Sequence, residues 1–189
     1  MVMERLREYA ERCLSLPPPM YQEQPIRYII ELDRNGRAVG APIDTANPSE
    51  PAAKRGGRRL APHIKRAASI KPKLLADTAV YALGIPTEKD RPERVPQQQA
   101  AFARLVEQCA AATNEPAVAA VAAFLGDLPE RLPALPDDFD PGAALTFRVD
   151  GVLPIDLPAV RTFWADFKGA GVADGDEADE AGDQLECIG

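Results

Sequence analysis

The chain has 189 residues, of which 46% are hydrophobic and only 6% aromatic, and it carries a formal net charge of −7. This length suits one ordinary domain with appendages, and its 19 prolines argue against a simple helical bundle because proline ends helices. The charged first 13 residues do not resemble a signal peptide and no apolar run is long enough to span a membrane, so we expect a cytoplasmic protein without membrane contact.

The first third of the chain predicts one helix and a pair of strands. Residues 2–14 place apolar side chains on one helical face, and the prolines at 17–19 end that helix. Residues 25–33 are rich in β-branched and aromatic side chains, which is typical of a strand. The Asn35–Gly36 turn predicts that residues 38–43 return beside that strand as a hairpin.

The middle of the chain is less regular. Residues 45–57 contain mostly Pro, Ser, Ala and Gly and are expected to form a mobile loop. Residues 59–64 predict a short strand. The apolar run 73–85 predicts a helical turn followed by a strand that ends at Gly84, and residues 87–96 predict a charged linker.

The last third predicts two helices, a strand and a final helix. Residues 97–112 have a helical apolar face, and Asn114 is expected to cap the next helix. A proline-rich acidic loop should occupy residues 128–141. Residues 145–149 predict a third strand, and residues 157–167 predict a helix with three bulky aromatic residues in the core.

Together these elements predict an α+β fold, with a short antiparallel sheet and helices packed on it. Residues 1–168 should form the domain. Residues 169–189 hold seven acidic residues and no basic one, with a composition typical of a flexible, disordered tail. The rest of the chain then has 22 acidic and 22 basic residues, so the low pI of about 4.9 belongs to the tail.

A strongly basic run opposes the acidic character of the chain. It holds eight basic residues and no acidic one: Lys54, Arg55, Arg58, Arg59, Lys65, Arg66, Lys71 and Lys73. Such a run attracts phosphate backbones, with an affinity that falls steeply as salt rises. Gly56 and Gly57 would allow the backbone to approach a nucleic-acid groove closely. The alternative is a solvated loop without a ligand.

The sequence contains few residues that suit catalysis or metal binding. His63 is the one histidine, and Cys13, Cys109 and Cys187 are too far apart in the sequence to suggest a zinc site. We therefore expect no cofactor, no bound metal and no enzymatic activity. A distant alternative is an Mg²⁺-dependent nuclease that uses the carboxylates of Asp137, Asp138 and Asp140.

Several segments resemble, in order, the amino-terminal part of the large subunit of the type I-C CRISPR Cascade complex. They are the opening helix with Leu16 to Tyr21, the strand 26–33, Leu60 to Arg66, Ile70 to Leu75, Tyr81 to Gly84, Leu145 to Gly151 and Ala159 to Trp164. The resemblance covers about residues 1–168. Family members are several times longer, so this chain is expected to be a fragment, a truncated product or a stand-alone piece.

The resemblance implies a non-catalytic subunit of a crRNA-guided antiviral surveillance complex. Such a subunit contacts the protospacer-adjacent motif (PAM) of double-stranded target DNA and helps to start R-loop formation, while guide pairing reads the target sequence. The implied partners are the other Cascade subunits, crRNA, target DNA and a recruited helicase-nuclease.

By position, residues 65–71 resemble the PAM-facing loop of the family. Ala67 and Ala68 stand where family members carry Gly with Asn or Ser, so Ser69 is the polar residue at the tip. The nucleic-acid-binding residues expected here are Lys54, Arg55, Arg58, Arg59, Lys65, Arg66, Ser69, Lys71 and Lys73. The alternative is an assembly module that binds the crRNA end or a neighbouring subunit without reading DNA.

Overall fold

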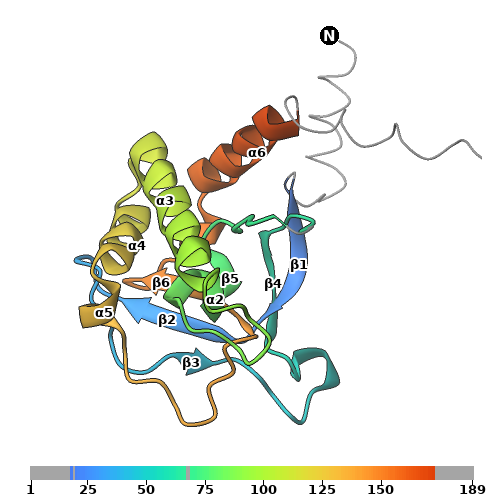
Figure 1. Ribbon diagram of the computed structural model, residues 1–189. Coiled ribbons are helices and arrows are strands. Elements are labelled where there is room, and N and C mark those ends of the chain that lie inside the picture. Colours follow the sequence, from blue (N-terminus) through green and yellow to red (C-terminus); the bar gives the residue numbers. More distant parts are fainter. Residues whose placement is uncertain (1–17, 19, 67–68, 173–189) are drawn as a thin grey trace, which may run out of the picture.

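A computed structural model describes residue 18 and residues 20–66 and 69–172, with side chains up to residue 167 (Figure 1). Within these residues, short sheets and packed helices confirm the predicted α+β class. The helix predicted at 2–14, the loop tip at 67–68 and the acidic residues of the predicted tail lie outside the described residues.

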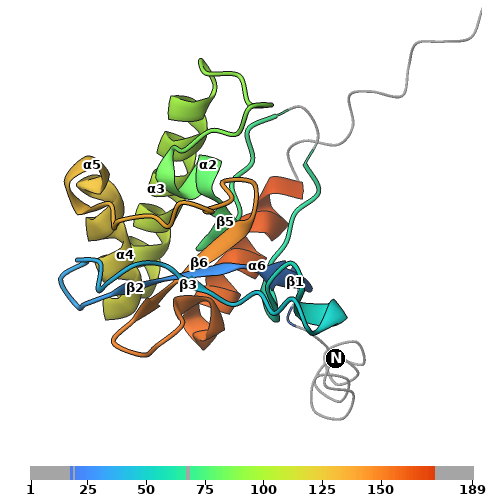
Figure 2. The same ribbon diagram turned by 90° about the horizontal axis from the view of Figure 1, so that it is seen from below.

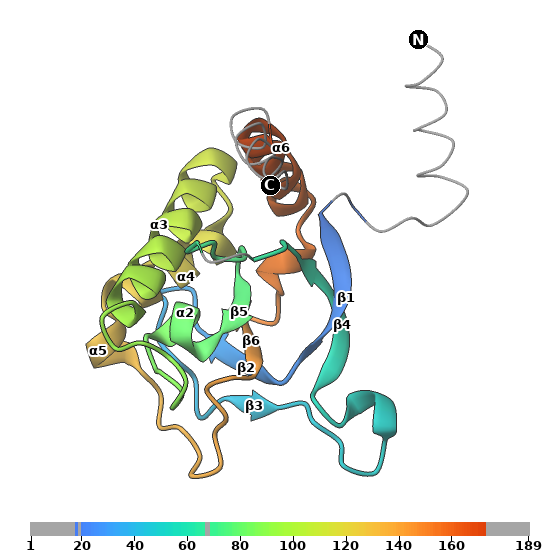
Figure 3. The same cartoon turned by 45° about the vertical axis from the view of Figure 1, so that its right-hand side comes forward.

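The strand predicted at 25–33 is two strands that belong to different sheets. Strand β1 (Tyr21–Ile26) pairs antiparallel with β4 (Gly57–Pro62), and β2 (Tyr28–Leu32) joins a second sheet. The break is at Arg27, whose N–H donates to the carbonyl of Ala144 in the second sheet. The β1–β4 ribbon therefore stands apart from the second sheet (Figure 3).

The second sheet has four strands in the order β3–β2–β6–β5, with β3 at Ile43–Asp44, β5 at Ala76–Thr78 and β6 at Ala144–Val149. Strands β3 and β5 are antiparallel to their neighbours, whereas β2 and β6 are parallel. The sequence predicted antiparallel pairing throughout. The parallel pair arises because the helices between β2 and β6 return the chain to the same end of the sheet, as a parallel connection requires.

Five α-helices and two short 3₁₀ helices complete the described part of the chain. They are α2 (Ala79–Leu83), α3 (Val95–Thr113), α4 (Pro116–Gly126), α5 (Leu128–Arg131), α6 (Pro158–Val172), η1 (Pro51–Ala53) and η2 (Pro154–Asp156). Helices α2, α3 and α4 lie together over one face of the four-stranded sheet (Figures 1 and 2). The β1–β4 ribbon lies at the opposite side of the molecule from α4 and α5.

Three local predictions were wrong. The predicted loop at 128–141 begins with the short helix α5 at Leu128–Arg131, in which the Leu128 side chain is buried. The run 73–85 forms a strand before a helix, because residues 76–78 pair with β6 and Gly84 then ends α2 in the left-handed conformation at φ 68°. Asn114 does not cap the following helix. It adopts φ 53° and ends α3, with its N–H donating to the carbonyl of Ala110, so Glu115 occupies the N-cap position of α4.

The core joins the helices to the four-stranded sheet. Phe147 of β6 contacts the rings of Phe102 from α3 and Phe124 from α4, and all three are fully buried. Trp164 of α6 is also fully buried, as predicted, whereas Phe167 is 39% exposed. Cys109 of α3 is a free cysteine packed in the core as a small apolar residue, and burial raises the pKa of its thiol to about 11.

Candidate nucleic-acid interface

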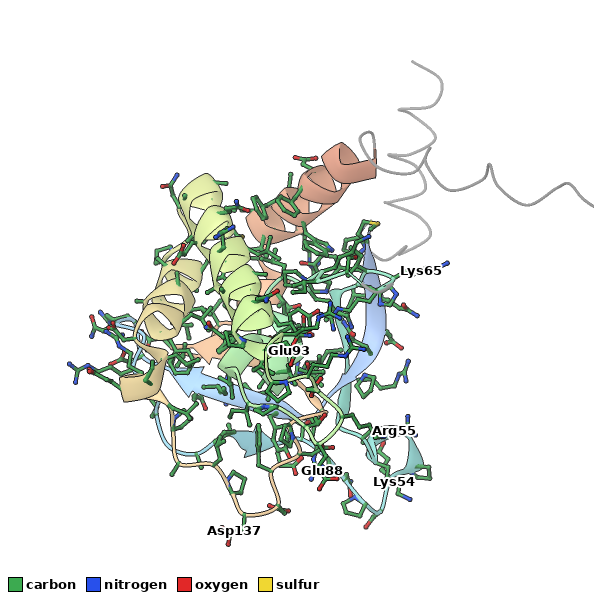
Figure 4. All side chains as sticks on the ribbon, in the orientation of Figure 1. Lys54, Arg55, Lys65, Glu88, Glu93 and Asp137 are labelled. Atoms are coloured by element: carbon green, nitrogen blue, oxygen red, sulfur yellow. The ribbon has the colours of Figure 1, made fainter. Side chains whose placement is uncertain are left out.

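The basic run is divided by the fold into three groups along the β1–β4 ribbon. Lys54 and Arg55 precede β4, Arg58 and Arg59 lie within it, and the others follow it. Figure 4 shows Lys54 and Arg55 near one end of the ribbon and Lys65 extending away from the other. Since β4 has six residues, these two ends are about 17–20 Å apart. The eight charges therefore do not form one compact patch.

The first group lies on an exposed turn. Lys54 and Arg55 are both exposed after η1, and Gly56 follows with φ 116°. A Cβ atom on Gly56 would come within 2.6 Å of the Arg27 backbone. The structural role of Gly56 is thus a close approach between the turn and the break that separates β1 from β2.

The second group lies on neighbouring positions of β4, which face opposite sides of the ribbon. Arg58 is exposed and its Nε lies 3.4 Å from Oε2 of Glu23 on β1. Arg59 is half-buried, and its Nε has no hydrogen-bond partner among the described residues. The pair with Glu23 partly offsets the charge of Arg58 at the surface.

The third group contains an internal ion pair. Arg66 bonds through Nη2 to Oδ2 of Asp77, and its Nε donates to the carbonyl of Lys71 at 2.8 Å. The guanidinium also lies 4.1 Å from the ring centroid of Tyr81, over its face. The Asp77 side chain is only 1% exposed. Arg66 therefore holds the loop together from inside.

Asp77 fixes both ends of the loop. Besides Arg66, its carboxylate accepts the backbone N–H groups of Lys73 and Thr78, each at 2.8 Å. Burial raises the pKa of Asp77, and the Arg66 guanidinium and these two N–H groups oppose that rise. A carboxylate in a dry site needs such donors, so the residues before and after the loop tip are tied to one buried group.

Lys73 also turns inward. Its Nζ donates to Oε1 of Gln24 on β1 at 3.0 Å. Burial lowers the pKa of Lys73; nearby Asp77 opposes this shift and Arg66 adds to it. Burial, followed by the charges of Lys73 and Lys65, likewise lowers the pKa of His63. The imidazole of His63 is therefore neutral near pH 7 and adds no positive charge here.

What the loop presents to solvent is a smaller set than the sequence predicted. Lys65, Ser69 and Lys71 are exposed, on either side of residues 67–68. Five residues of this group were predicted to contact nucleic acid. The side chains of two of them, Arg66 and Lys73, instead bind other parts of the protein. We call residues 65–71 the basic loop.

Asp77 and Tyr81 are the site residues that the sequence analysis missed. A signal was present, because Asp77 is the one charged residue between Lys73 and Glu88, in an otherwise apolar run. A lone carboxylate in such a run is costly to bury unless it has a cationic or hydrogen-bonding partner. The nearest basic run upstream supplies that partner through Arg66.

The acidic segment near residue 140 has a structural explanation. Asp137, Asp138 and Asp140 are all exposed. Asp140 also accepts the N–H of Gly142, and its Oδ2 lies 3.8 Å from Nη1 of Arg27. The Phe139 ring packs against Tyr28, with ring centroids 4.5 Å apart. Across residues 18, 20–66 and 69–172 no group of three or more His, Cys, Asp or Glu side chains is placed to hold a metal ion.

The fold and the basic loop define a small α+β protein whose candidate site is an exposed loop with basic side chains. Residues 4–187 match the family described as CRISPR-associated protein (Cas_Csd1). Because this match spans nearly the whole chain, the protein belongs to that CRISPR-associated family, and its role lies in a CRISPR system with other Cas components. A search of curated proteins found no match. No helix among the described residues combines the length and apolarity needed to cross a membrane.

Proposed function

We propose that this chain is the amino-terminal part of a type I-C Cascade large subunit, and that its basic loop contacts the PAM region of duplex DNA. The observation that carries the proposal is the loop itself. Exposed Lys65, Ser69 and Lys71 project from a base that the buried Asp77 fixes. A fixed base reduces the conformational entropy that the loop loses on binding.

The exposed residues of the basic loop suit two different kinds of contact with DNA. Lys65 and Lys71 carry point charges that suit phosphate oxygens and position the duplex without reading its sequence. Ser69 has a hydroxyl that can donate to or accept from a base edge. The proposed role is binding that helps to open the duplex, without catalysis by this chain, and guide pairing reads the target.

Binding to duplex DNA over a range of salt tests the phosphate contacts. We expect the Lys65→Ala/Lys71→Ala variant to bind about tenfold more weakly at low salt, with the slope of log K against log salt reduced by about 1.8, because each phosphate contact contributes about 0.9. The matched control is Arg34→Ala/Arg37→Ala, which removes the same charge from an exposed turn beside α4 and α5. Equal losses in both variants would reject the basic loop as the contact.

Selection from duplexes with a randomised flanking sequence tests base reading, with the chain assembled with its Cascade partners. We expect the intact chain to enrich a short motif and Ser69→Ala to weaken that enrichment while the salt slope stays unchanged. An unchanged motif in Ser69→Ala would remove Ser69 from the proposal. Assembly without any DNA contact from the loop would favour the assembly-module alternative.

A further inference from the structure

A charged segment before α3 is neutral in sequence, but its basic and acidic residues are distributed unequally around one pocket. Between Thr87 and Arg94 there are three acidic residues, Glu88, Asp90 and Glu93, and three basic ones, Lys89, Arg91 and Arg94. The structure contains a pocket of about 320 Å³ that is lined by Lys89, Asp90, Arg91, Arg94 and Gln98. All three cations line this pocket, whereas Glu88 and Glu93 do not.

The one acidic residue in the lining, Asp90, is held by neutral donors and keeps its negative charge, so the lining carries three positive charges and one negative charge. Oδ2 of Asp90 accepts the backbone N–H of Thr87 at 2.8 Å and its hydroxyl at 2.6 Å. These bonds hold the turn that begins at Thr87, and a second turn, in which the N–H of Arg94 donates to the carbonyl of Arg91, leads into α3. The backbone thus fixes the segment that carries the three cations.

The start of α3 adds to the positive potential of the pocket. This helix has 19 residues, and its first turn contains no acidic residue to offset the positive end of its dipole. Gln98, in that first part of the helix, supplies an amide to the lining. The basic side chains carry the argument for a site, chiefly the exposed Lys89 and Arg91, and the helix end strengthens it.

The lining also indicates what kind of anion fits. It contains no aromatic residue on which a base could stack. Lysine and arginine suit phosphate oxygens, and a volume of about 320 Å³ exceeds what a single phosphate group needs. A phosphate that belongs to a longer chain fits this description better than a free ion.

We infer that the pocket formed by Lys89, Arg91, Arg94 and Gln98 binds the phosphodiester backbone of a nucleic-acid strand, independently of sequence. This inference rests on the proposed nucleic-acid-binding function but uses residues outside the basic loop. It gives the chain a second contact, which would hold a strand while the basic loop engages duplex DNA.

Binding of a single-stranded oligothymidylate to the full chain, followed by fluorescence anisotropy, tests the pocket. We expect Lys89→Ala/Arg91→Ala to weaken binding about tenfold at low salt and to reduce the salt slope by about 1.4, since each single-strand contact contributes about 0.7. Both side chains are exposed, so the fold should be unchanged, which circular dichroism verifies. The control is Arg34→Ala/Arg37→Ala, and an equal loss in both would overturn the inference.

A second arm separates the strand from a free phosphate. Amide NMR shifts of residues 89–98 are followed with inorganic phosphate alone and with the oligothymidylate. We expect saturable shifts with the oligonucleotide at far lower concentration, and none in the double variant. Shifts with phosphate but not with the oligonucleotide would overturn the assignment to a strand.

These experiments can reject the pocket inference and the proposed function independently of each other. If Lys65→Ala/Lys71→Ala loses duplex affinity while Lys89→Ala/Arg91→Ala matches its control, the pocket inference is wrong and the proposed function stands. If only the pocket variant loses affinity, the pocket is supported and the basic loop is not the contact.

Discussion

Arg66 with Asp77 and Arg148 with Glu31 are the same kind of ion pair in two regions of the molecule. At the base of the basic loop, the Asp77 side chain is 1% exposed and its partner Arg66 is 25% exposed. On the four-stranded sheet, Arg148 of β6 meets Glu31 of β2 through two bonds of 2.6 Å, with exposures of 31% and 27%. The carboxylate of the first pair is inside the protein, whereas both members of the second pair are partly exposed at its surface.

The two carboxylates respond in opposite ways to similar partners. Hydrogen bonds from Arg148 lower the pKa of Glu31, and partial burial opposes this shift without reversing it. Burial raises the pKa of Asp77 despite Arg66. The comparison shows that desolvation decides whether an ion pair favours the charged carboxylate, and that the buried pair has more to lose if one partner is removed.

Removing the buried carboxylate should have the largest effect. Asp77→Ala leaves the Arg66 guanidinium and the Lys73 N–H without their acceptor, so we expect the free energy of unfolding to fall by about 3 kcal/mol. Urea denaturation measures this change. The control, Glu31→Gln, should cost only about 0.2–1 kcal/mol because the pair is at the surface. Similar costs for both variants would contradict the comparison.

Changing the shape of the cation while keeping its charge should have an intermediate effect. Arg66→Lys loses the bond to the Lys71 carbonyl and the stacking on Tyr81, so we expect a loss of about 1–2 kcal/mol. Arg148→Lys, the matched surface change, should lose less than about 1 kcal/mol. Hydrogen exchange adds a local readout, because only the first variant should lower protection around residues 71–73.

The smallest effect is a difference in the direction of pH dependence. The pKa of Glu31 is lower in the folded protein than in the unfolded chain. Its ionisation therefore adds to the free energy of unfolding above the unfolded pKa, and this addition is lost as pH falls through the folded pKa. The pKa of Asp77 is higher in the folded protein than in the unfolded chain. Its titration therefore adds to the free energy of unfolding below the unfolded pKa, and this addition is lost as pH rises through the folded pKa. Carboxyl-carbon NMR should find Glu31 titrating below its ordinary value and Asp77 above it. Shifts in the same direction would reject this account.

Local sequence patterns predicted much of the fold. Helix α3 and strand β6 lie where apolar spacing and β-branched or aromatic residues placed them. The sequence did not reveal the break at Arg27 or the parallel pairing of β2 with β6, because these depend on contacts between residues more than 100 positions apart. Nor did it reveal the strand at 76–78, since three residues are too few for a periodic signal.

At the candidate site, too, some features could be predicted from the sequence and others depended on the tertiary structure. The sequence by itself determined that eight positive charges follow one another without an acidic residue, and that a small-residue segment lies among them. Only the tertiary structure decided which charges face solvent. It brought Asp77 to Arg66 and Gln24 to Lys73, leaving Lys65 and Lys71 exposed. The physical reason is that a charge count is local in the chain, whereas burial and the partners it requires depend on the packing of distant segments.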